Sequence, residues 1–129
     1  MAHYYDSSAL VFLVVDGRRS AAMWQFWSRH AVPVASLVAR TELMRAVRRV
    51  SPGQEEPARR LLASIEVLAL PPAILDAAAR LDPVSLRSLD AIHLATALDL
   101  GDDLESFVTY DDRLAAAARG CGLVVVRPE

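Results

Sequence analysis

The sequence predicts an α/β fold with a mainly parallel central sheet that is covered by helices on both faces. Short runs of apolar and β-branched residues alternate with longer segments of helical periodicity along the whole chain. The connections between these segments are short, and such alternation is typical of parallel sheets with helical crossovers. We find no internal repeat, low-complexity tract or dividing linker, so residues 1–129 are expected to form one domain.

Local signals define where the elements begin and end. Ser7 or Ser8 can cap the helix that follows Asp6, because a hydroxyl oxygen accepts the first free N–H groups of a helix. Residues 51–53 (SPG) end a helix, and the prolines at 71–72 suit the start of a helix better than its interior. In chain order we expect a strand at 3–5, a helix after Asp6, a helix at 20–30, a strand at 33–36, helices at 37–50 and 55–65, a strand at 66–70, helices at 71–81 and from 86 onward, a strand at 106–109, a helix at 111–122 and a strand at 123–126.

The composition indicates a compact protein without a membrane anchor. Hydrophobic residues make up 53% of the chain, the mean hydropathy is +0.25 and the formal net charge is −2. No apolar run reaches the roughly 18 residues that span a bilayer. The apolar segment near the N-terminus lacks a basic leader and a cleavage site, so we expect no signal peptide. The single Cys121 cannot form an internal disulfide, which favours a cytoplasmic location.

All 14 basic residues are arginine, and the absence of lysine excludes several classes of enzyme. A Walker-type phosphate loop needs a specific lysine. Schiff-base enzymes and phosphoacceptor receiver domains need one as well.

Four acids stand where the sequence places the carboxyl ends of strands, which form the working edge of open α/β sheets. Asp6 follows the first strand, Glu42 lies in the helix after the second, Asp90 lies in the first turn of its helix, and Asp111 follows the strand at 106–109. Taken singly, Asp6 and Asp111 could each be a helix cap, and Glu42 could belong to a solvated helix face. Because all four acids are expected at the same edge of the sheet, we interpret them as one shared site.

Asp90 is the hardest of these acids to explain as a surface residue. Leu86, Leu89, Ile92 and Leu94 surround it at helical spacing, which predicts an apolar, core-facing stripe. A buried carboxylate without a partner costs several kcal/mol, so Asp90 needs a hydrogen-bond partner or a cation.

The segments YYDSSALV, RTELMRAV, LRSLDAIHLATA and VTYDDRLAAAARGCGL resemble the PIN domain of VapC-type toxins from bacterial toxin–antitoxin pairs. The resemblance extends from Tyr4 to Val126. DAIHLATA, around Asp90, is its most specific element, and the D-x-S-A start at Asp6 is the next. Residues 52–82 carry little signature.

This resemblance implies a PIN-like fold and a metal-dependent endoribonuclease. Carried over by position, the catalytic and metal-binding residues are Asp6, Glu42, Asp90 and Asp111, which would hold Mg²⁺ or Mn²⁺. Ser8 and Thr109 would support these acids. Carboxylate oxygens suit such hard cations, which can activate water to hydrolyse a phosphodiester bond.

Several nearby residues compete for a role. The T-x-D spacing of the family selects Asp111 as the ligand, and Asp112 is then a helix cap or first-turn acid. We interpret His93 as a packing residue, since no second histidine stands at metal-binding spacing. Asp99 belongs to an acidic loop region that is expected to be solvated.

The expected partners follow from the same resemblance: an RNA substrate, a small cognate antitoxin and a second copy of the chain in a homodimer. Guanidinium groups bind phosphate oxygens well, and the arginines expected to contact RNA are Arg40, Arg45, Arg87 and Arg113. Two alternatives remain. One is a non-catalytic binding module of PIN fold. The other is a metal-dependent phosphatase with Asp6 as nucleophile, which the absence of lysine disfavours.

Overall fold

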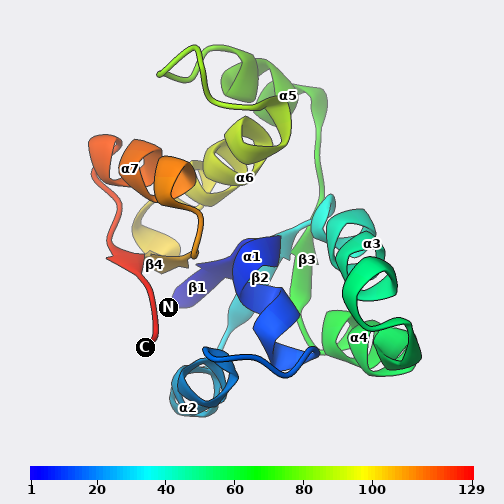
Figure 1. The fold of residues 1–129 in the computed structure, drawn as a ribbon. Coiled ribbons are helices and arrows are strands. Elements are labelled where there is room, and N and C mark those ends of the chain that lie inside the picture. The colour runs from blue at the N-terminus through cyan, green and yellow to red at the C-terminus, as the bar shows by residue number, and fades with distance from the viewer.

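A five-stranded sheet lies at the centre of the structure, and every neighbouring pair of strands is parallel (Figure 1). The computed structural model describes residues 1–129. The strand order is β3-β2-β1-β4-β5. The strands are β1 (Ala2–Tyr5), β2 (Pro33–Ser36), β3 (Glu66–Leu68), β4 (Leu104–Val108) and β5 (Val125–Val126). The predicted α/β class with a mainly parallel sheet is therefore confirmed, and the sheet is parallel throughout.

Each strand and helix expected from the sequence has a counterpart. The helices are α1 (Ser7–Leu10), α2 (Ser20–Arg29), α3 (Ala39–Val50), α4 (Glu55–Ala63), α5 (Pro72–Ala79), α6 (Ser88–Asp99) and α7 (Asp112–Gly120). Short 3-10 helices cover Val11–Leu13, Pro52–Gln54 and Gly101–Asp103. None of the helices combines the length and the hydropathy that crossing a membrane would require.

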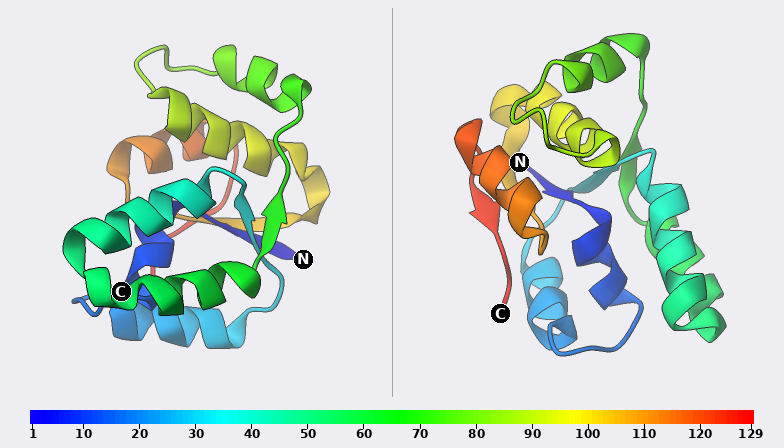
Figure 2. Two further views of the ribbon diagram at one scale, coloured as in Figure 1. Left: turned by 90° about the vertical axis from the view of Figure 1, so that its right-hand side faces the viewer. Right: turned by 45° about the horizontal axis from the view of Figure 1, so that its top comes forward.

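The helices form two layers, one on each face of the sheet. In the left view of Figure 2, α5, α6 and α7 lie above the strands and α2 and α4 lie below them, while α1 and α3 share the core of the lower layer. Neighbouring residues of a strand point to opposite faces, which divides the core in two. Tyr4 and Phe107 pack with residues of α6 and α7, whereas Tyr5 and Val108 pack with residues of α1 to α4.

The cap of the first helix differs from the expectation. Asp6, and not Ser7 or Ser8, caps α1, because its carboxylate accepts a hydrogen bond from the backbone N–H of Ala9 at 3.2 Å. Asp6 has an extended backbone just before the first helical residue, which turns its side chain back over the first turn. Ser7 and Ser8 already belong to the helix.

The direction of α6 brings Asp90 to the working edge of the sheet. The C-terminal end of α6 leads through residues 101–103 directly into the start of β4. The helix therefore runs against the strands, and its first turn lies near their carboxyl ends. Asp6 and Asp111 follow β1 and β4, which are neighbours in the sheet. The topology thus gathers acids from distant segments at one edge.

Candidate functional site

Asp6 is the most buried of the acids at the carboxyl edge, with 4% of its surface exposed. Its Oδ1 atom accepts a hydrogen bond from the Ser8 hydroxyl at 2.6 Å, and its Oδ2 atom accepts one from the Thr109 hydroxyl at 2.7 Å. Burial raises the pKa of Asp6 to about 6, although these hydrogen bonds and the nearby His93 oppose the shift. Ser8 and Thr109 therefore hold this carboxylate in place.

Asp111 is joined to Asp6 through Thr109. The backbone N–H of Asp111 donates to the Thr109 hydroxyl oxygen at 3.0 Å, and the Asp111 carboxylate caps α7 by accepting from the N–H of Leu114 at 3.0 Å. Asp111 is thus both a helix cap and a member of the acidic group. Asp112 is a first-turn acid, as expected, but the cap belongs to Asp111, and Asp112 forms an ion pair with Arg127 instead.

Asp90 lies in the first turn of α6 and is half-buried. Burial raises the pKa of Asp90, and the negative charges of Asp111 and Glu42 raise it further, while His93 and Arg87 oppose the shift. The expected apolar stripe around Asp90 is only partly present, since Leu89 is 47% exposed. Both burial and the acidic neighbours therefore disfavour the charged form of Asp90.

Glu42 reaches the group from α3 and is held by a histidine. The Nε2 atom of His93 contacts Oε1 of Glu42 at 2.5 Å, and Nδ1 of the same ring contacts the Tyr4 hydroxyl at 2.6 Å. His93 is buried, as a packing residue would be, but both of its ring nitrogens are used for hydrogen bonds. The sequence interpretation missed this role. The spacing of His93 one turn after Asp90 was a signal, but its partners come from β1 and α3.

Two of the four predicted arginines lie beside the acids. Arg87 and Arg113 line a hollow of about 260 Å³ together with Asp90, Asp111 and Asp112. We call this space the acidic hollow. Arg40 lines a different hollow with Arg59, and Arg45 is exposed on α3. The structure therefore brings Arg87 and Arg113 to the acids and leaves Arg40 and Arg45 elsewhere.

The donor set suits a hard divalent cation. Carboxylate oxygens are the ligands that Mg²⁺ and Mn²⁺ prefer, and burial together with the negative charges of Asp111 and Glu42 raises the pKa of Asp90, so a cation beside it would be favourable. No three or more His, Cys, Asp or Glu side chains are arranged so that they could hold a metal ion together. Mg²⁺ commonly uses only one or two carboxylates, with water and substrate phosphate completing its shell. Asp90 and Asp111, which share the acidic hollow, can supply such a pair.

Comparison with known sequences agrees with this description. Residues 4–120 match the model of the PIN domain. The chain is 42% identical to Ribonuclease VapC46 of Mycobacterium tuberculosis, over 98% of both chains. It is 38% identical to Ribonuclease VapC47 of the same species, over 97% of this chain and 96% of that relative.

Solved structures show the same fold. A toxin–antitoxin complex from Klebsiella pneumoniae contains a chain that is 25% identical, with a TM-score of 0.76 and coverage of 99% of this chain and 98% of that one. VapC20 of Mycobacterium tuberculosis, described as a sarcin-ricin loop cleaving toxin, has a TM-score of 0.80 at 20% identity, over 98% of this chain and 100% of its own. The similarity to VapC20, at 20% identity, shows the fold alone.

Proposed function

Because the chain belongs to the PIN-domain family, we propose that it is the ribonuclease toxin of a VapC-type toxin–antitoxin pair and hydrolyses RNA with Mg²⁺ or Mn²⁺. The relatives named as ribonucleases match nearly the whole chain. The observation that carries the proposal is the meeting of acids from separate segments at one edge of the sheet. At this edge, burial and then the negative charges of Asp111 and Glu42 raise the pKa of Asp90.

We propose that Asp6, Glu42, Asp90 and Asp111 form the acidic site, in which Asp90 and Asp111 bind the cation directly and Glu42 and Asp6 add negative charge behind them. A bound divalent cation supplies the Lewis acidity that activates water and offsets charge on the phosphate. Asp90 and Asp111 are open to the acidic hollow, while Glu42 is partly exposed and Asp6 is buried. Asp90 and Asp111 are thus the most accessible of the four acids, and the negative charges of Glu42 and Asp6 lie behind them.

The remaining polar residues of the site position these acids and the substrate. Ser8 and Thr109 hold Asp6, and His93 holds Glu42. Arg87 and Arg113 stand at the acidic hollow, where their guanidinium groups can bind phosphate oxygens of the RNA backbone. Arg40 and Arg45 do not line the acidic hollow, and we assign them to other phosphates of a longer RNA.

The phosphatase alternative loses support from the surroundings of Asp6. A nucleophilic aspartate needs a free oxygen that faces the substrate. Both carboxylate oxygens of Asp6 accept hydrogen bonds from hydroxyl groups, and the side chain is buried. Asp6 is therefore placed to support a charged site and not to attack a phosphate.

Cleavage of labelled total transfer and ribosomal RNA tests the proposal. The purified chain is incubated with Mg²⁺, with Mn²⁺ or with a chelator, and Asp90→Asn is compared with Asp99→Asn, an exposed acid at the far end of the same helix. We expect discrete cuts that need metal, vanish in Asp90→Asn and persist in Asp99→Asn. Direct attack by water leaves a 5′-phosphate, so products ending in a cyclic phosphate contradict the mechanism.

We further propose that a small antitoxin binds this chain and blocks the site, and that the toxin forms a homodimer. Support comes from the similar chain in the toxin–antitoxin complex of Klebsiella pneumoniae. Expression of the toxin alone should arrest growth, and expression together with the product of the adjoining reading frame should relieve the arrest. Arrest by Asp90→Asn as strong as that by the unaltered chain would contradict a nuclease toxin.

A further inference from the structure

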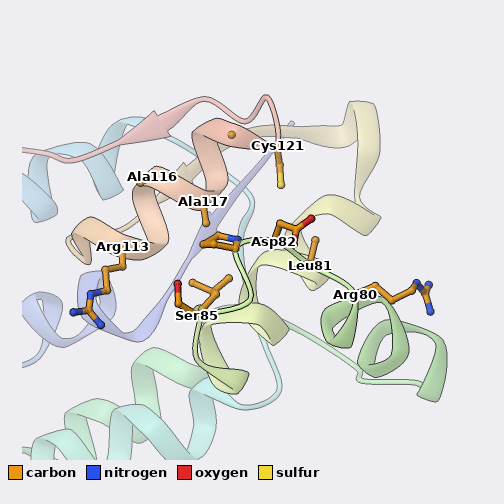
Figure 3. Close-up of a pocket in the computed structure, with 11 residues that line it drawn as sticks. Arg80, Leu81, Asp82, Ser85, Arg113, Ala116, Ala117 and Cys121 are labelled. Carbon is orange, nitrogen blue, oxygen red and sulfur yellow. The ribbon is translucent and has the colours of Figure 1, made fainter.

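A second, larger hollow lies beside the acidic hollow. It has a volume of about 1010 Å³ and is formed by the loop between α5 and α6 on one side and by α7 on the other (Figure 3). We call it the large hollow. Its volume lies at the upper end of the range of ligand pockets. Nothing in the proposed catalytic mechanism uses this space.

The two hollows adjoin each other. Ser85, Leu86 and Arg113 line both of them. An RNA strand that places one phosphate beside Asp90 and Asp111 therefore has its neighbouring nucleotide at the mouth of the large hollow. Arg113 stands at the junction, where it can contact the phosphate between the two positions.

The lining of the large hollow suits a nucleobase. Leu81 and Leu86 supply apolar surface, and Ala116, Ala117 and Gly120 of α7 leave room because their side chains are small or absent. A flat base can lie against such a surface without meeting long side chains. RNA is read in single-stranded form largely by contacts to unstacked bases of this kind.

One polar group in the large hollow is free to read the edge of a base. Asp82 is exposed and forms no hydrogen bond or ion pair through its side chain. In Figure 3 its carboxylate points toward Cys121 across the hollow. A carboxylate only accepts hydrogen bonds. Guanine presents two N–H donors side by side on its Watson–Crick edge, so it can pair with both oxygens of one carboxylate.

We propose that the large hollow binds the unpaired nucleotide next to the scissile phosphate, and that Asp82 gives it a preference for guanine. This inference rests on the proposed ribonuclease function. The occupant is assigned as a nucleotide because the hollow shares Ser85, Leu86 and Arg113 with the acidic hollow and because Arg113 and Arg80 line it together with the apolar surface.

Protection of Cys121 provides a readout that does not depend on activity. Cys121 is exposed, lines the large hollow and is the single cysteine of the chain, so a nucleotide in this space covers its thiol. The probes are six-nucleotide single-stranded RNAs of uridine, either unchanged or with one central guanosine, adenosine or cytidine. Asp90→Asn protein is used so that the probes stay intact, and the rate of alkylation by iodoacetamide is followed by mass spectrometry.

We expect the probe with guanosine to protect Cys121 at a concentration about tenfold lower than the uridine probe, in keeping with one bidentate contact. Adding Asp82→Asn should remove this difference, whereas adding Asp102→Asn, at an exposed acid outside the hollow, should keep it. Adding Ala116→Trp, which fills the space, should abolish protection by all probes.

Other outcomes overturn the inference in distinguishable ways. If the unaltered chain cuts RNA but no probe protects Cys121, the nuclease stands and the nucleotide site fails. Protection without RNA that disappears on dilution would show that a second copy of the chain occupies the hollow. If the unaltered chain neither cuts nor binds RNA, the proposed function fails and the nucleotide site fails with it.

Discussion

The Nε2 atom of His93 lies 2.5 Å from Oε1 of Glu42, and the other nitrogen of the ring is fixed by the Tyr4 hydroxyl. Burial, and after it the negative charge of Asp6, raises the pKa of Tyr4 well above its ordinary value, so this hydroxyl keeps its proton. It can therefore donate to Nδ1, which leaves Nε2 to carry the N–H that donates to Glu42. His93 therefore fixes the position of the Glu42 carboxylate through its Oε1 atom.

His93→Ala should weaken metal binding because it releases Glu42. Loss of a residue that orients an acidic group at a metal site should cost up to about 10- to 100-fold in affinity or activity, as it does for residues behind the ligands of metal sites. Tyr4→Phe keeps the ring of His93 and should cost less. The measurement is the cleavage rate as a function of Mn²⁺ concentration. We expect excess Mn²⁺ to restore much of the rate, whereas a low rate at every metal concentration would argue for a purely structural role.

Ser8→Ala and Thr109→Val should each destabilise the protein because each leaves the buried Asp6 with one hydrogen bond fewer. The expected loss is about 1 to 3 kcal/mol in the free energy of unfolding for each variant. Urea unfolding in the presence of a chelator measures it. Thr109→Ser keeps the hydroxyl and serves as the control. Unchanged stability in both variants would show that the hydroxyl groups do not support Asp6.

The fold was predictable because its signals are local. Helix caps, proline positions and the alternation of apolar segments are read within a few residues, and together with known crossover rules they indicate a parallel sheet. The first helix is the exception. The sequence predicted a helix after Asp6 but not its end, and α1 ends at Leu10 and continues as a 3-10 helix over Val11–Leu13. Apolar residues packed on all sides carry no periodicity that marks where a helix ends.

The site was predictable only in part. The acids follow from strand ends and from the family resemblance, whereas the contact between His93 and Glu42 joins residues that are 51 positions apart. Likewise, the large hollow depends on how the loop between α5 and α6 faces α7. Such contacts depend on tertiary packing, which periodicity within a segment cannot reveal.

Arg87→Ala and Arg113→Ala should weaken binding of RNA more than they slow its cleavage. Both residues stand at the acidic hollow, where they can contact phosphates. Each lost contact should lower the slope of log affinity against log salt by roughly 0.7 for single strands. Fluorescence anisotropy at several salt concentrations measures this, with Arg119→Ala at the exposed end of α7 as the control. An equal effect of Arg119→Ala would show that only overall charge matters.

Acid should destabilise the protein partly through His3. Burial lowers the pKa of this histidine, and His30 and the N-terminus act in the same direction, while Glu105 opposes them. Because the unfolded state then binds the proton more readily, stability is full above the ordinary histidine pKa of about 6.5 and is lost as the pH falls through it. Urea unfolding at pH 7.5 and pH 5.5 should show a smaller difference for His3→Gln. An unchanged difference would assign the acid sensitivity to other groups.

The central claim is that the acids at the carboxyl edge of the sheet hold a divalent cation. Calorimetric titration of the purified chain with Mn²⁺ tests it most directly, with Asp90→Asn and Asp99→Asn measured in parallel. We predict saturable binding that raises the melting temperature, is lost in Asp90→Asn and is kept in Asp99→Asn. Equal binding by the two variants, or no binding by the folded, unaltered chain, would contradict the account.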